Sequence, residues 1–516
     1  MNGSTYPGRS TPEPIALRVL SLLSVLGLIG IPSAFVAWHH LDSSNLWFDE
    51  SGQYWLAQGL HHFSPPNSPP GGWARIVEYG RVFNSDPGGF TLLLRGWTTV
   101  LGNSPVVLRS LPFLFFLLTP TVIFFAARRI GANSLVASLA ASAPLGFAIL
   151  LHYATEIRAY SMESCGVTWF FFLSCWLREE TRWSRVIWMG IVAALLVTSR
   201  YSAFFYGAAA CLTTLMPMRP LGAAVRRVLC FSIPCAMAVA AGFLIFARYQ
   251  AGGTQRPPAY VEAFILKGKT SVEMLAQFHD NFLSKEGLPI ACFLILAPIF
   301  VWFGPRALSR LRTVVGRAAM FSLFAVTFAI VASLTGKLPW EIHTRWSIGY
   351  QALSASCLAM GVIAIGNCLA LWATSLPWKA LAAVATCGSV GVWAVRIDHT
   401  IHTERPYYET IASHLTKLAQ SPGAKDLRFF VQSGASPTVR YLCEVGPLRG
   451  TYRYPENFHF ETGAEEKEAK PIAAEDFDVV ILTHFTIAEG YLRRVVGGTV
   501  NLQLTPQPSC LLLLTK

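Results

Sequence analysis

The amino-acid sequence predicts a polytopic α-helical membrane protein that ends in a small α/β domain. Of its 516 residues, 53% are hydrophobic and only 14% are charged, well below the ~25% of charged residues in a typical soluble chain. Apolar windows of bilayer length recur through most of the chain. After about residue 396 they give way to shorter apolar runs among polar segments. The chain therefore divides into a membrane domain, 1–396, and an outward-facing C-terminal domain, 397–516.

Roughly eleven transmembrane helices are predicted, divided by charged or Pro/Gly-bearing breaks. The first follows Arg9 and Arg18 and is too long for the apolar core of a signal peptide, so we expect an uncleaved helix and a cytoplasmic N-terminus. Alternating sides from there leaves basic residues in every inner loop, as the positive-inside rule requires. The predicted spans are 19–38, 107–127, 132–150, 161–177, 186–199, 201–216, 228–247, 287–304, 318–335, 347–371 and 378–395.

The formal net charge of +12 indicates membrane topology more than a nucleic-acid partner, because the basic residues form short clusters between apolar spans instead of one patch. The sequence holds no P-loop and no nucleophile elbow, and its adjacent histidine pairs lack the spacing of a helical zinc site. Nine of the 11 cysteines lie in apolar stretches, where they act as small hydrophobes. Cys443 and Cys510 lie in the polar C-terminal region. Their spacing is compatible with a disulfide and with two separate thiols.

The regions outside the spans have features of their own. The first outer loop, 39–106, is Pro/Gly-rich and ends in an apolar stretch from Phe90 to Leu101. We expect that stretch to be a helix in the membrane interface, since Arg95 interrupts it and it is too short to span. In the C-terminal domain, 427–432 and 477–483 are typical of buried strands and 407–419 of an amphipathic helix, which together predict a small α/β layer.

Two adjacent carboxylates stand just after the first predicted span. Asp49 and Glu50 end the hexapeptide Asn45-Leu46-Trp47-Phe48-Asp49-Glu50, in which the two aromatic residues favour the membrane interface. An ordinary solvated turn would explain the pair if it stood alone. A carboxylate held at a membrane surface is also suited to act as a general base on a substrate presented from the lipid.

Further charged residues are gathered on the same predicted side of the membrane. A carboxylate is suited to deprotonate an acceptor hydroxyl, and an arginine to neutralise charge that develops on a phosphate leaving group. Taken singly, each residue has a structural explanation, such as a salt-bridged helix end or a side chain that snorkels to the headgroups. As a group they favour a site for a phosphate-bearing lipid. The group comprises Glu156, Arg158 and Arg345, with His152, Tyr160 and His343 as neighbours.

At these motifs the chain resembles the GT-C superfamily of membrane glycosyltransferases, in particular the bacterial branch related to protein O-mannosyltransferases and the lipid A aminoarabinose transferase. The resemblance rests on several short stretches and covers most of the chain. In the branch the second stretch more often reads His-Pro-Pro-Leu-Tyr, so Asp86 and its glycines depart from the pattern. The stretches are Leu46-Trp47-Phe48-Asp49-Glu50, Asp86-Pro87-Gly88-Gly89-Phe90, Leu108-Arg109-Ser110-Leu111-Pro112, Glu156-x-Arg158-x-Tyr160 and Thr344-Arg345-Trp346.

The resemblance implies transfer of a sugar from a polyprenyl-phosphate donor to a glycan, lipid or protein acceptor at the outer face, with inversion. Asp49 would be the base, and Glu50 would orient it or contact the acceptor. Arg158 and Arg345 would hold the donor phosphate. Glu156 matches a second acidic position that helps bind a divalent cation in some relatives, although no cofactor is expected here because arginine supplies the same charge. The site would face the periplasm or the cell exterior.

Two other classes of function compete with the enzyme. In a transporter or flippase of lipid-linked saccharides, the same charges would line a passage. Carriers often show inverted repeats and charges near the bilayer midplane, whereas here no repeated halves are evident and the charges lie in outer loops. A receptor or scaffold built on the C-terminal domain would not need Asp49 and Glu50 at all.

Overall fold

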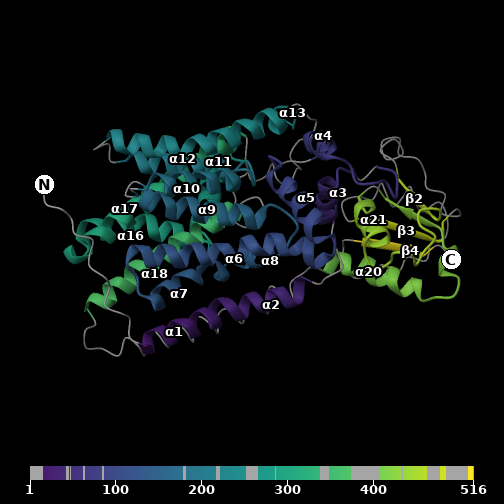
Figure 1. Ribbon diagram of the computed structural model, residues 1–516, viewed down its shortest axis with the longest axis horizontal. Helices are drawn as coiled ribbons and strands as arrows, with labels where there is room; N and C mark the ends of the chain where they lie inside the picture. The colour runs from purple at the N-terminus through teal and green to yellow at the C-terminus, as the bar shows by residue number, and fades with distance from the viewer. Residues whose placement is uncertain are drawn as a thin grey trace.

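The computed structural model describes most of the chain. Its described residues are 15–41, 46, 48–61, 64–83, 86–177, 180, 182–216, 221–250, 265–284, 286–336, 348–372, 406–432, 434–461, 477–483 and 510–514. A helical bundle forms one part of the molecule and a small sheet with its helices forms the other (Figure 1). The boundary predicted at 396/397 and the predicted span 378–395 lie outside the described residues, so both stay predictions.

The bundle consists of apolar helices at the remaining ten predicted spans, which confirms the helical membrane class. Among the described residues, five helices are long and apolar enough to cross a membrane, or six if a bent pair is one span. The exact number of spans stays a prediction. The elements are α1 (Ile15–Val25), η1 (Leu26–Gly30), α2 (Ile31–His40), α6 (Pro105–Ile130), α7 (Ser134–Ala141), η2 (Ala143–Gly146), α8 (Ala148–His152), α9 (Tyr160–Trp176), α10 (Trp183–Val197), α11 (Ala203–Leu215), α12 (Leu221–Gly242), η4 (Phe243–Ala247), α13 (Arg248–Gln250), α15 (Ser271–Leu283), α16 (Leu288–Phe303), η5 (Arg306–Leu308), α17 (Ser309–Leu334) and α18 (Ile348–Trp372).

The predicted span 132–150 is not one continuous helix. It is divided into α7, the short η2 turn and α8. Pro144 lies in the break, and proline lacks the backbone N–H that a continuous helix requires. The apolar window was therefore right about a helical region and wrong about its continuity at this place.

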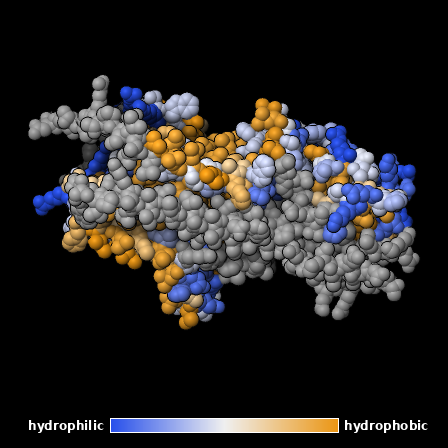
Figure 2. Space-filling model, turned by 90° about the horizontal axis from the view of Figure 1, so that it is seen from below, coloured by the Kyte–Doolittle hydropathy of each residue, from blue (hydrophilic) through white to orange (hydrophobic). Residues whose placement is uncertain are grey.

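Helix α9 forms the centre of the bundle. All of its residues are buried except Trp169, and it packs against α6, α11, α17 and α18. Phe171 meets Phe321 of α17 edge to face, with ring centroids 5.6 Å apart. Many large hydrophobic side chains are exposed on the bundle helices, and Figure 2 shows hydrophobic residues over the bundle with hydrophilic residues toward both ends. This distribution is that of an integral membrane protein.

Three shorter helices cover the end of the bundle nearest the sheet: α3 (Phe48–Ala57), α4 (Trp73–Phe83) and α5 (Gly89–Leu101). The helix predicted at Phe90 to Leu101 is confirmed as α5, while its place in the interface stays a prediction. Two glycines allow it to start: Gly88 has a φ of 82°, which favours glycine, and a Cβ on Gly89 would collide with Thr198. Helix α5 packs on α3 and α6 through Phe90 and Leu94.

The C-terminal part contains a four-stranded sheet in the order β2-β1-β3-β4. Strand β1 (Phe429–Val431) pairs in parallel with β2 (Phe458–Phe460) and β3 (Val479–Thr483), and β4 (Cys510–Leu514) runs antiparallel to β3. Both predicted strands and the predicted amphipathic helix, α20 (Pro406–Ala419), are confirmed. Helix α21 (Ser436–Glu444) and the short η7 (Ala424–Asp426) complete the layer.

Cys443, one of the two cysteines for which a disulfide was left open, does not form one. Cys443 is a buried free thiol on α21, where it packs in the core with Phe429, Val439 and Leu442. Burial raises the pKa of this thiol to about 12, so it stays protonated and unreactive at neutral pH. It therefore serves as a small core residue.

Candidate functional site

The adjacent acids Asp49 and Glu50 lie in the first turn of α3 but have different surroundings. Asp49 is partly exposed, whereas Glu50 is 1% exposed. Carboxylates are favoured at this end of a helix because the backbone N–H groups and the helix dipole point toward them. The fold thus separates two neighbouring residues of like charge, one toward the surface and one into the protein.

Glu50 forms a buried ion pair with Arg109 of α6. Its Oε2 lies 2.9 Å from Arg109 Nη2, and the Arg109 side chain is fully buried. Its Oε1 accepts hydrogen bonds from Arg109 Nε at 3.4 Å and from the backbone N–H of Ile157 at 3.1 Å. Because both oxygens have donors, the Glu50 side chain is held in one orientation.

Arg109 reaches this position because of how α6 begins. The Ser104 side chain accepts a hydrogen bond from the Val107 N–H at 3.3 Å, and Pro105 occupies the first turn. These are the usual start signals of a helix. Arg109 then lies one turn inside the apolar helix, where an unpaired guanidinium would be costly. The pairing with Glu50 follows from that cost.

The bond from Ile157 joins the acid pair to the second predicted loop. Ile157 lies between Glu156, which is 2% exposed, and Arg158. The Arg158 guanidinium lies 5.9 Å from the centre of the Tyr160 ring. The structure therefore places Glu50, Glu156, Arg158 and Tyr160, all predicted from sequence, in one neighbourhood. His152 is at its edge, with its ring 4.7 Å from that of Tyr153.

A third arginine, Arg200, adjoins this neighbourhood and was not predicted as a site residue. Arg200, between α10 and α11, lies 3.0 Å from a Glu163 oxygen and 3.5 Å from an Asp86 oxygen. Its guanidinium is 5.1 Å from the centre of the Tyr160 ring. Ser202 donates a further hydrogen bond to Glu163. Tyr160 is therefore flanked by Arg158 and Arg200.

The sequence did contain a signal for two further residues that were not predicted as site residues, Arg109 and Glu163. Arg109 and Glu163 are charged residues inside apolar helices, a setting in which ionisable groups are rare and usually functional or paired. Asp86 was noted only as a departure from a motif. The sequence does not show that Asp86 pairs with Arg200, because the two residues are far apart along the chain. They meet only after α9, α10 and α11 have packed.

Two predicted site residues are not placed. Arg345 and His343 lie outside the described residues, so their part in the site stays a prediction. Within the described ranges, no group of three or more His, Cys, Asp or Glu side chains is arranged to hold a metal ion. The charges brought together here are carboxylates and guanidinium groups.

The sequence matches no family model and no curated protein, but solved structures share its architecture. ArnT from Cupriavidus metallidurans bound to undecaprenyl phosphate is similar over 97% of this chain and 98% of its own, with a TM-score of 0.50 and 12% identity. The apo form of the same protein is similar over 95% of this chain and 98% of its own, with the same TM-score and identity. An apo Archaeoglobus fulgidus oligosaccharyltransferase aligns over 91% of this chain and 69% of its own, with a TM-score of 0.46 and 12% identity. The chain therefore shares the fold of ArnT over 97% of its length.

Proposed function

We propose that this protein is a membrane glycosyltransferase that moves a hexose or pentose from a polyprenyl-phosphate donor to an acceptor. The observation that carries the proposal is the likeness to ArnT with undecaprenyl phosphate bound, which extends over 97% of the chain. The clustering of Asp49, Glu50, Glu156 and Arg158 at one end of the bundle adds chemical support. A fold alone does not define a reaction, and the site residues supply the chemistry.

In the proposed reaction Asp49 is the general base. Its carboxylate removes the proton of an acceptor hydroxyl as that oxygen attacks the anomeric carbon of the donor sugar. The bond between the anomeric carbon and the phosphate oxygen breaks, polyprenyl phosphate leaves, and the configuration inverts. Partial exposure of Asp49 suits this role. Glu50, whose oxygens are both bonded, orients the start of α3.

Arg158 is proposed to bind the donor phosphate, together with Arg345. A guanidinium pairs with phosphate through two parallel hydrogen bonds and neutralises the charge of the leaving group. Arg109 and Arg200 are engaged by carboxylates in the structure, so we assign them to holding the site together. We propose that the reaction needs no cofactor, since arginine provides the charge that a divalent cation would otherwise supply.

The proposed location is the bacterial inner or cell membrane, with the N-terminus in the cytoplasm. The site and the C-terminal domain would face the periplasm or the exterior. The positive-inside distribution of arginine supports this orientation. The proposed partners are a polyprenyl-phosphate sugar, a glycan, lipid or protein acceptor, and the lipids of the membrane.

The test is sugar transfer by purified protein in liposomes, with radiolabelled polyprenyl-phosphate sugars and a crude extract of lipids and glycans. Asp49→Asn should lower transfer about 10²–10⁴-fold, the usual contribution of a general base, with donor binding retained. Asp280→Asn is the matched control, because Asp280 is an exposed acid on α15. Donor binding without transfer by the wild-type protein would support a transporter instead.

A further inference from the structure

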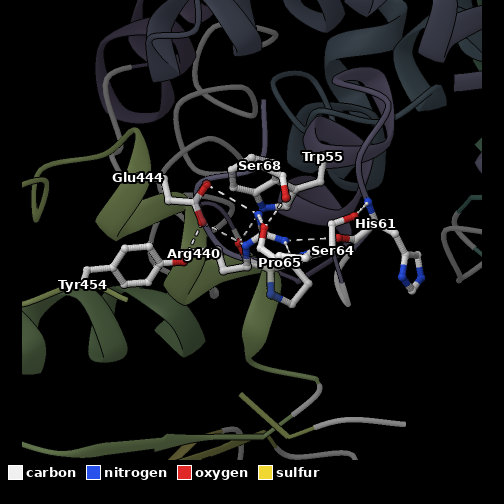
Figure 3. Close-up of polar contacts among 9 residues, drawn as sticks. Trp55, His61, Ser64, Pro65, Ser68, Arg440, Glu444 and Tyr454 are labelled. Atoms are coloured by element: carbon white, nitrogen blue, oxygen red, sulfur yellow. Dashed lines mark hydrogen bonds and ion pairs between the residues drawn. The ribbon is translucent and has the colours of Figure 1, made fainter. Parts of the chain in front are cut away.

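One buried arginine of the C-terminal domain reaches into the first outer loop. Arg440 of α21 is 1% exposed. Its Nη1 donates to the backbone oxygens of His61 at 3.1 Å and Ser64 at 3.0 Å, and its Nη2 donates to that of Pro65 at 3.5 Å (Figure 3). These oxygens lie where α3 has ended and the Pro/Gly-rich loop begins.

The same guanidinium is fixed from its other side. Glu444, one helical turn along, lies 3.0 Å from Arg440 Nε and accepts a hydrogen bond from the Tyr454 hydroxyl at 2.5 Å (Figure 3). The guanidinium also lies 4.6 Å from the centre of the Trp55 ring on α3, within the range of a cation–π contact. Arg440 thus contacts both α3 and the segment that follows it.

Three neighbours of Arg440 on α21 hold the body of α3. The Thr438 and Ser51 hydroxyl oxygens are 3.1 Å apart, and Trp55 Nε1 donates to the Pro437 oxygen at 2.9 Å. The Tyr441 and Tyr54 rings meet edge to face at 5.2 Å. We call Pro437, Thr438, Arg440 and Tyr441 the α21 clamp. Ser51, which the clamp holds, directly follows Glu50.

A helix as short as α3 needs such contacts. It has ten residues, and isolated helices below ~12–15 residues are marginal in water. On its other side α3 is held by α5, where Gln53 donates to Thr91 at 2.8 Å. The orientation of the first turn, which carries Asp49 and Glu50, is therefore set by the bundle on one side and by the α21 clamp on the other.

We propose that Arg440 is a positioning residue for the acid pair, so that the C-terminal domain forms part of the catalytic unit through a static contact. This inference rests on the proposed glycosyltransferase function, because it assigns Arg440 to the efficiency of transfer. The physical basis is that a small displacement of a base from its substrate lowers the rate steeply while leaving distant binding contacts in place.

The first experiment compares Arg440→Ala with Arg453→Ala in the full-length protein. Arg453 lies in the same domain, and its replacement by alanine removes the same charge. Its side chain is 60% exposed and forms an ion pair with Asp426. Arg440→Ala should lower kcat about tenfold or more with little change in the KM for the donor, and Arg453→Ala should change neither. Equal effects of both variants would overturn the proposal, as would a change in donor KM alone.

Hydrogen exchange on the same variants gives a readout that does not need turnover. Amides of α3 should exchange faster in Arg440→Ala, while amides of β1 and β3 keep their protection and show that the domain is folded. Unchanged exchange in α3 would overturn the positioning role even if the wild-type protein transfers no sugar. A failure of the proposed function is thereby distinguished from a failure of this inference.

A cross-link tests whether the contact is static. Ser51→Cys with Thr438→Cys replaces the two hydroxyls that lie 3.1 Å apart, and oxidation should join α3 to α21. A static clamp predicts that the oxidised protein keeps its transfer rate, and that the link restores transfer in the Arg440→Ala background. Reversible loss of transfer on oxidation, with the single-cysteine variants unaffected, would show that the domain must separate during turnover and would overturn the proposal.

Discussion

Helix α6 carries two arginine–glutamate ion pairs, one near each end, and they differ in burial. Arg109 and Arg129 are separated by about 30 Å along the helix, close to the thickness of a bilayer core. Arg109 is fully buried against Glu50 at 2.9 Å. Arg129 pairs with Glu180 at 2.7 Å but is 37% exposed. The same type of ion pair thus differs in effect, since a buried pair fixes one arrangement of side chains and a partly exposed pair contributes little to stability.

The surroundings of each pair sharpen the difference. Glu180 has a second arginine, Arg185, at 3.6 Å, so it retains a partner if Arg129 is lost. Glu50 is bonded to Arg109 and to the backbone N–H of Ile157. Arginine at the end proposed to be cytoplasmic is therefore replaceable, whereas Arg109 holds the start of the helix that carries the proposed base.

The largest effect is expected from Arg109→Ala. It would leave Glu50 as a buried carboxylate without its guanidinium, and breaking a buried pair in this way costs about 3–5 kcal/mol. Thermal unfolding in detergent measures the loss of stability, and the liposome assay should show that transfer is lost as well. A variant as stable and as active as the wild-type protein would contradict the role given to this pair.

Replacing both members of the buried pair should separate stability from function. In the double variant Glu50→Met with Arg109→Met no buried charge remains, and such apolar replacements are often neutral or stabilising. We expect unfolding within about 1 kcal/mol of the wild-type protein but transfer reduced about tenfold or more, because the start of α3 is no longer oriented. Full transfer by the double variant would show that the pair serves stability alone.

A small effect is expected from Arg129→Ala, the matched control on the same helix. A partly exposed pair contributes about 0–1 kcal/mol, and Arg185 remains beside Glu180. The same unfolding and transfer measurements apply. A loss as large as that of Arg109→Ala would remove the distinction between the two ends of α6.

The smallest effect is expected from removal of metal ions. If arginine supplies the charge at the donor phosphate, EDTA followed by dialysis should change transfer by less than about twofold. Restoration by added Mg²⁺ or Mn²⁺ after a larger loss would show that a cation belongs to the site, and Glu156 would then be the first ligand to substitute. Arg129→Ala treated in parallel controls for effects of EDTA on the liposomes.

Much of the fold could be predicted because its signals are local. Apolar windows identified ten helical regions of the bundle, and the strands β1 and β3 stood out as short apolar runs. The break between α7 and α8 was missed, although Pro144 marks it. The Asp49-Glu50 pair was recognised from its place after a hydrophobic span, and Glu156 and Arg158 from their predicted place on the same side of the membrane.

The partners of the site residues could not be predicted in the same way. Glu50 and Arg109 are 59 positions apart, and Arg440 is 379 positions from His61. The local sequence places Arg109 inside an apolar stretch and Arg129 at its end, but it does not show that Arg109 is fully buried against Glu50 while Arg129 stays 37% exposed. That distinction depends on which helices cover each end of α6.

The sequence by itself determined the membrane class, the approximate positions of the helices and the presence of an acid pair just after the first predicted span. These properties follow from hydrophobicity and from charge counted along the chain. Only the tertiary structure decided that Glu50 is locked by Arg109, that Arg200 joins Asp86 to Glu163, and that Arg440 of α21 holds α3. The reason is that a buried charge requires a partner nearby in space, and helix packing brings together residues that are distant along the chain.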